Sequence, residues 1–119
     1  MTHTHLDTAA ISYHAAARYT IRFEPEYATD RDGDTLLDND VDTDILASMY
    51  RDDYRDEYLD TCNEIRRVIK AAGDMAQVKE RGQKSNHPRY WINPDQMVAI
   101  AADGGIVSIM RPRAGVYNG

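Results

Sequence analysis

Cysteine and long hydrophobic runs are scarce in this sequence of 119 residues. A single cysteine, Cys62, excludes an intramolecular disulfide and is typical of a reducing compartment. The longest apolar run, from Met97 to Ala102, is too short to span a bilayer, and no charged segment followed by an apolar one opens the chain. We therefore expect a cytoplasmic protein, in the cytosol of a bacterial host, that makes no contact with membranes.

Sequence signatures of catalysis are also missing. The chain contains no G-x-S-x-G, no phosphate-binding glycine loop and no H-E-x-x-H, and one cysteine cannot build a thiolate cluster. His14 and His87, as possible proton carriers, are better interpreted as surface or turn residues. We expect no catalytic residue, no cofactor and no metal site.

An aspartate-rich loop from Asp30 to Asp44 keeps one alternative open. Asp30, Asp32 and Gly33 match part of a calcium-binding loop, but the first and last ligand positions are occupied by Ala28 and Asn39. We interpret Asp32-Gly33 as a tight turn. A small metal-dependent enzyme or regulator that uses this loop is the alternative function.

Positive charge is in the minority. Fourteen lysines and arginines face twenty aspartates and glutamates, which gives a formal charge of −6 and a pI of about 5.0. An acidic protein repels polyanions, so direct binding to DNA, RNA or an anionic membrane is disfavoured and a basic partner is favoured.

The hydrophobic pattern predicts one α+β domain over residues 1–119, with frayed termini at about 1–10 and 114–119. Apolar and polar residues alternate from Ala17, which predicts a strand ended by Pro25. We expect an antiparallel sheet of about four strands, near 17–24, 89–92, 97–102 and 106–111. A long or broken helix near 43–72 is expected to cover one face of this sheet.

The predicted helix changes its buried side along its length. From Tyr54 onward an apolar stripe includes Tyr58, Cys62 and Ile65, whereas Val41 and Leu46 lie out of phase with that stripe by well over about 100°. This mismatch predicts a break or kink near residues 50–53, and hence two helices or one bent helix.

Opposite the apolar stripe lies a row of carboxylates. Neighbouring like charges on a helix cost roughly 0.2–0.5 kcal/mol per pair. Carboxylates four residues apart are spaced by about 6 Å along the helix axis, close to the phosphate spacing of a nucleic-acid strand. A solvated acidic face is the simpler interpretation, and a partner-binding face is the functional one. The candidate partner-binding residues are Asp52, Asp53, Asp56, Glu57, Asp60 and Glu64.

This acidic helix, next to the loop from Asp30 to Asp44, resembles in type the small acidic anti-CRISPR and anti-restriction proteins of phages and mobile elements. The resemblance covers about a third of the chain and involves no specific motif. It implies a non-enzymatic, nucleic-acid-mimicking inhibitor. The chain departs from the strongest mimics in its moderate net charge and its fourteen basic residues.

The leading hypothesis is therefore an acidic binding protein that inhibits a nucleic-acid-handling partner by occupying its basic groove with a carboxylate-lined helix. We expect a monomer or a homodimer. A structural or assembly protein is a further alternative, besides the metal-dependent one.

Overall fold

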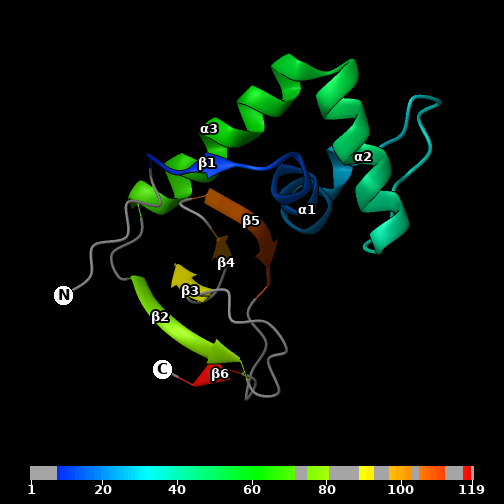
Figure 1. Ribbon diagram of the computed structural model, residues 1–119. Helices are drawn as coiled ribbons and strands as arrows, with labels where there is room; N and C mark the ends of the chain where they lie inside the picture. The colour runs from blue at the N-terminus through cyan, green and yellow to red at the C-terminus, as the bar shows by residue number, and fades with distance from the viewer. Residues whose placement is uncertain are drawn as a thin grey trace.

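The computed structural model describes residues 8–71, 75–80, 89–92, 97–102, 105–111 and 117–118. Three α-helices precede most of the sheet in the chain (Figure 1). The elements are β1 (Ala10–Ile11), α1 (Tyr13–Phe23), the short 3-10 helix η2 (Pro25–Tyr27), α2 (Asp40–Asp52), α3 (Arg55–Ala71), β2 (Met75–Glu80), β3 (Arg89–Ile92), β4 (Met97–Ala102), β5 (Gly105–Met110) and β6 (Tyr117–Asn118).

The strands form one sheet in the order β1-β5-β4-β3-β2-β6. The four longer strands, β2 to β5, pair antiparallel with their neighbours, as does β6 with β2. Only β1 runs parallel to its neighbour, with Ile11 opposite Ile106. The α+β class is therefore confirmed, and the expectation of an antiparallel sheet is corrected at this one edge.

Three of the four predicted strands are confirmed as β3, β4 and β5. The fourth, near 17–24, is wrong, because these residues belong to α1. Ser12 begins this helix, and its side-chain oxygen accepts a hydrogen bond from the Ala15 amide at 2.9 Å. The fourth long strand of the sheet is instead β2, which no strand pattern predicted.

The alternating pattern misled because α1 is buried on nearly all sides. It packs against β5, α2 and α3, and every residue from Ala15 to Ile21 is buried. A helix enclosed in this way needs no amphipathic period, so the alternation between residues 17 and 24 carries no information about a strand.

The helix predicted near 43–72 is two helices. Asn39 begins α2 by accepting a hydrogen bond from the Asp42 amide at 2.7 Å. α2 ends at Asp52, the amides of Asp53 and Tyr54 both bond to the Met49 carbonyl, and α3 starts at Arg55. Figure 1 shows α2 and α3 meeting at this break as the two arms of a V.

α2 does not cover the sheet in the expected way, since α1 lies between it and β5, whereas α3 reaches the sheet at β1 (Figure 1). The apolar stripe of α3 is nevertheless inside, as predicted: Cys62, Ile65 and Ile69 are buried, and Tyr54 and Tyr58 are half-buried. The Tyr58 hydroxyl donates to the Ile11 carbonyl and so ties α3 to β1.

The termini differ in part from the frayed ends that we expected. Ala9 is buried, Ala10 pairs with Gly105, and β6 pairs with β2. The rest of the expected frayed ends, residues 1–7, 114–116 and 119, lies outside the described part of the chain, as does His87.

Candidate functional site

A cleft of about 520 Å³ opens between α1, the segment after it, α2 and α3. This volume lies within the range of about 300–1,000 Å³ that is common for ligand sites. Among the described residues that line it, five are carboxylates and none is a lysine or an arginine. The carboxylates are Glu24, Asp30, Glu57, Asp60 and Glu64, and the other lining residues are Thr20, Tyr27, Thr29, Leu46, Met49, Tyr50, Tyr54 and Thr61.

The break between α2 and α3 divides the predicted row of carboxylates. Asp52 is the last residue of α2, Asp53 lies in the break, and the other four candidates are on α3. The row that we expected on one continuous helix is therefore interrupted after Asp52. Three of the six candidates, Glu57, Asp60 and Glu64, line the cleft, and the other three do not.

Half of the candidates are neutralised by arginines of the same chain. Asp52 pairs with Arg51 at 2.9 Å, Asp53 with Arg31 at 2.5 Å, and Glu64 with Arg67 at 2.5 Å. Hydrogen bonds from these arginines hold the pKa of Asp52 and of Glu64 below their usual values. Such surface pairs add little stability, about 0–1 kcal/mol each, but they reduce the charge that a partner meets.

The other half, Asp56, Glu57 and Asp60, is exposed and forms no ion pair with any residue that the structure describes. Asp56 and Glu57 lie in the first turn of α3, where the helix dipole favours negative charge. These three side chains are the free negative charge of the predicted face.

Buried hydroxyl groups form part of the cleft wall. The Thr20 and Tyr50 hydroxyls are 2.7 Å apart, and Thr20 also donates to the Ala16 carbonyl at 3.1 Å. Burial raises the pKa of Tyr50, although hydrogen bonds with Thr20 and Thr61 oppose this rise. Tyr50 therefore stays neutral at physiological pH, and the hydrogen bonds hold α1, α2 and α3 together at the cleft.

Glu24 adds a carboxylate from the C-terminal end of α1, where its amide donates to the Thr20 carbonyl at 2.9 Å. Partial burial, together with the Glu64 and Glu26 carboxylates, raises the pKa of Glu24 above its usual value. None of the described residues forms an ion pair with Glu24. The cleft thus holds negative charge at a cost to folding.

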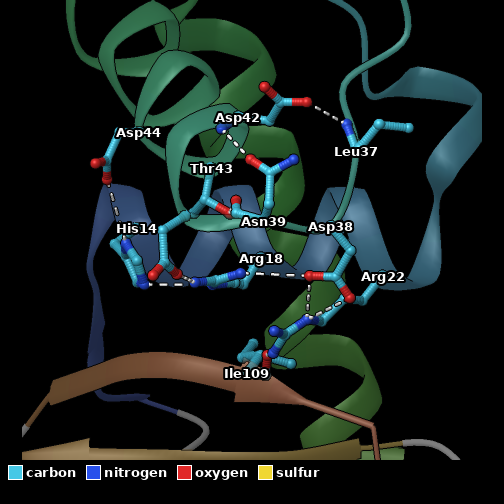
Figure 2. A network of polar contacts seen from close by, with 11 residues as sticks. His14, Arg18, Arg22, Leu37, Asp38, Asn39, Asp42, Thr43, Asp44 and Ile109 are labelled. Carbon is cyan, nitrogen blue, oxygen red and sulfur yellow. Dashed lines mark hydrogen bonds and ion pairs between the residues drawn. The ribbon is translucent and has the colours of Figure 1, made fainter.

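The aspartates of the loop from Asp30 to Asp44 are used differently. Arg18, a buried residue of α1, donates to Asp38 at 3.3 Å and also contacts Asp40. Arg22 donates to the same Asp38 at 3.0 Å and to the Ile109 carbonyl at 2.7 Å. Figure 2 shows both arginines of α1 converging on Asp38. This cluster ties the start of α2 to α1 and the sheet.

His14 closes the cluster on its other side (Figure 2). Its Nε2 accepts a hydrogen bond from Arg18 Nε at 3.4 Å, and its Nδ1 lies 4.0 Å from the Asp44 carboxylate. Burial and the positive charge of Arg18 lower the pKa of His14, against the opposing effect of Asp44 and Asp40. The histidine is therefore neutral at physiological pH.

The predicted tight turn at Asp32-Gly33 is confirmed. The Asp30 carboxylate accepts hydrogen bonds from the amides of Asp32 and Asp34, both at 2.9 Å, and Gly33 has a φ of 86°. Asp42 accepts from the Leu37 amide at 2.6 Å. Within the described residues, no three histidine, cysteine or carboxylate side chains are grouped so that they could hold a metal ion.

Sequence reasoning missed Glu24 and Thr20, because it placed both on a strand that does not exist. It also missed Asp30 as a lining residue of the same cleft as α3. The signal that was present is Ser12, a good helix-capping residue followed by three alanines. Extending that helix by three turns brings Thr20 and Glu24 to its C-terminal end.

No protein-family model matches this chain, and comparisons with curated proteins and with solved structures found no match. In the part of the chain that the structure describes, every helix is too short or too polar to cross a membrane.

Proposed function

We propose that this chain is a non-enzymatic, cytoplasmic inhibitor of a nucleic-acid-handling complex, of the kind found in bacterial defence systems and similar in type to anti-CRISPR proteins. It acts by placing the free carboxylates of α3 in a basic groove of its partner. The observation that carries the proposal is that Asp56, Glu57 and Asp60 form no ion pair with any described residue, although the chain pairs Asp52, Asp53 and Glu64 with arginines.

Charge distribution supports the proposal in a second way. Asp56 and Asp60 are one helical turn apart on α3, so their carboxylates repeat at about 6 Å. A groove that binds the phosphates of a nucleic acid presents cations at a comparable interval. Electrostatic attraction at such a surface mainly raises the association rate and makes it sensitive to salt.

The proposal is tested with a panel of purified CRISPR effector complexes and restriction endonucleases, assayed for DNA binding and cleavage. We expect the wild-type protein to inhibit at least one member and to associate with it more slowly as salt rises. The triple variant Asp52→Lys/Asp56→Lys/Asp60→Lys should associate at least about tenfold more slowly.

A matched pair of single variants separates a local effect from one of net charge. Asp60→Lys and Asp44→Lys change the charge of an exposed helical residue equally, but only Asp60 is on the proposed face. Asp60→Lys should slow association several-fold more than Asp44→Lys. Unchanged inhibition by a folded triple variant, or no inhibition across the panel, would refute the proposal.

One observation favours assembly as a second candidate function. Val41 and Ile45 are one turn apart on α2, and their side chains are exposed, as is that of the nearby Leu37. Exposed apolar residues that lie together are common at interfaces between protein chains. If this face forms a homodimer, Val41→Glu/Ile45→Glu converts a dimeric mass at micromolar concentration into a monomeric one, and a monomeric wild type rules this candidate out.

A further inference from the structure

The cleft described above combines three properties that together define the ligand it can take. It is hollow, with about 520 Å³ of space, its described lining includes carboxylates but no lysine or arginine, and three tyrosines, Tyr27, Tyr50 and Tyr54, contribute to the same lining. An anion is repelled by this lining. A purely apolar ligand leaves the carboxylates without a partner.

We propose that the cleft is the site at which this protein receives one arginine side chain of its basic partner. The inference rests on the proposed function, which it extends from a charged face to a defined pocket. The guanidinium group is held by the free carboxylates of Glu24, Glu57 and Asp60, and its flat face packs on a tyrosine ring.

The carboxylates determine the charge of the ligand. Glu24 comes from the end of α1, and Glu57 and Asp60 come from α3, so negative charge meets the ligand from two helices. No described residue forms an ion pair with any of these three. Burial, and after it the nearby carboxylates of Glu64 and Glu26, raises the pKa of Glu24, and a bound cation would relieve the repulsion between these carboxylates.

The tyrosines and hydroxyls favour guanidinium over ammonium. A guanidinium is planar, weakly hydrated, stacks on aromatic rings and donates in several directions at once, whereas an ammonium is compact and strongly hydrated. Tyr54 is half-buried at the break between α2 and α3, and Tyr27 is 69% exposed. Because a side chain enters a cleft head first, the more exposed Tyr27 can contact the aliphatic stem of the arginine, and the less exposed Tyr54 can contact its guanidinium group.

The test uses a neutral peptide with one arginine, acetyl-Gly-Gly-Arg-Gly-Gly-amide, and two peptides in which lysine or citrulline replaces the arginine. Binding to the full chain is followed by NMR titration of backbone amides. Citrulline keeps the shape of arginine and removes the charge. For one side chain we expect a Kd of about 1 mM for the arginine peptide and at least about tenfold weaker binding of the citrulline peptide.

Two double variants of equal charge locate the site. Glu57→Gln/Asp60→Asn removes two carboxylates from the cleft, and Asp52→Asn/Asp56→Asn removes two outside it. All four residues are exposed, so both variants should fold. We expect the cleft variant to bind the arginine peptide about tenfold more weakly and the outer variant less than twofold more weakly.

Four results would overturn the inference. Equal losses in the two variants would mean that diffuse charge and not the cleft binds the peptide. Equal affinity for lysine and arginine would refute the guanidinium assignment, and equal affinity for citrulline would refute the role of charge. Absence of measurable binding to the wild type would also refute the pocket.

Failure here is distinguishable from failure of the proposed function. If the peptide does not bind but Asp52→Lys/Asp56→Lys/Asp60→Lys still abolishes inhibition of a defence complex, only the arginine pocket is wrong. If no defence complex is inhibited but the arginine peptide binds with the expected variant pattern, the pocket stands and the inhibitory role fails.

Discussion

The acidic loop and the acidic cleft have similar compositions and opposite electrostatic environments. In the loop, Asp38 and Asp40 surround the buried Arg18, and Asp30 and Asp42 accept hydrogen bonds from backbone amides. In the cleft, Glu57 and Asp60 form no ion pair with a described residue. The loop uses its carboxylates to fold the chain, whereas Glu57 and Asp60 of the cleft make no such contact and, in our proposal, are the ones that meet a partner.

This difference shows why a count of aspartates does not locate a binding surface. A carboxylate paired inside the fold offers a partner little net charge, and removing it leaves a buried arginine without its counter-ion. A carboxylate without a partner contributes nothing or a penalty to folding and is fully available for binding. The three predictions that follow separate the two groups by stability.

The largest effect is expected from removing the two carboxylates around Arg18. The double variant Asp38→Asn/Asp40→Asn leaves a buried guanidinium without a carboxylate and should lower the free energy of unfolding by about 3 kcal/mol. The matched cleft variant, Glu57→Gln/Asp60→Asn, should change it by less than about 0.5 kcal/mol. Urea denaturation of both variants measures the difference. Similar losses in the free energy of unfolding would mean that the loop and the cleft carboxylates stabilise the fold equally.

A smaller effect concerns His14, which sits beside Arg18. The folded protein has a His14 pKa below the ordinary 6.5, so between 6.5 and that lower pKa the unfolded chain binds more protons. The contribution of His14 to the free energy of unfolding is therefore fully present above pH 6.5 and is lost as the pH drops through this window. His14→Gln should lose this dependence, which amounts to about 2–3 °C in Tm for the half-exposed side chain. An identical pH profile for both proteins would contradict the assignment.

The smallest effect is expected in the cleft and has the opposite sign. The pKa of Glu24 is raised above 4.5 in the folded protein, which therefore binds more protons than the unfolded chain just above pH 4.5. Ionised Glu24 destabilises the fold once the pH exceeds that raised pKa. Glu24→Gln should raise Tm by about 1 °C at pH 7 and leave it unchanged at pH 4, while Asp56→Asn, which removes one exposed carboxylate outside the cleft, serves as the charge-matched control. A lower Tm for Glu24→Gln at pH 7 would show that Glu24 stabilises the fold.

Local sequence patterns predicted the elements that are buried on one face and exposed on the other. The stripe from Tyr54 to Ile65 indicated the buried side of α3, and the change of phase predicted the break that the structure places after Asp52. The residues at Asp32-Gly33 were also sufficient to predict the tight turn, because an Asx-type turn is stabilised by neighbouring residues alone.

The pattern failed where tertiary packing overrides it. α1 is enclosed by the sheet and two helices, and its buried Arg18 is tolerated only because Asp38 and Asp40 come from a different segment. The candidate carboxylates were identified from the sequence, but their division into paired and free groups was not. That division depends on Arg31, which is distant in sequence from Asp53, and on the position of Glu24 in the cleft.

The most direct test of the account is an NMR titration of the side-chain carboxyl carbons with the single-arginine peptide. The account predicts that the signals of Glu24, Glu57 and Asp60 shift together with saturation, while those of Asp38 and Asp40 do not move. Small uniform shifts across all carboxylates, or shifts confined to the loop, would contradict it.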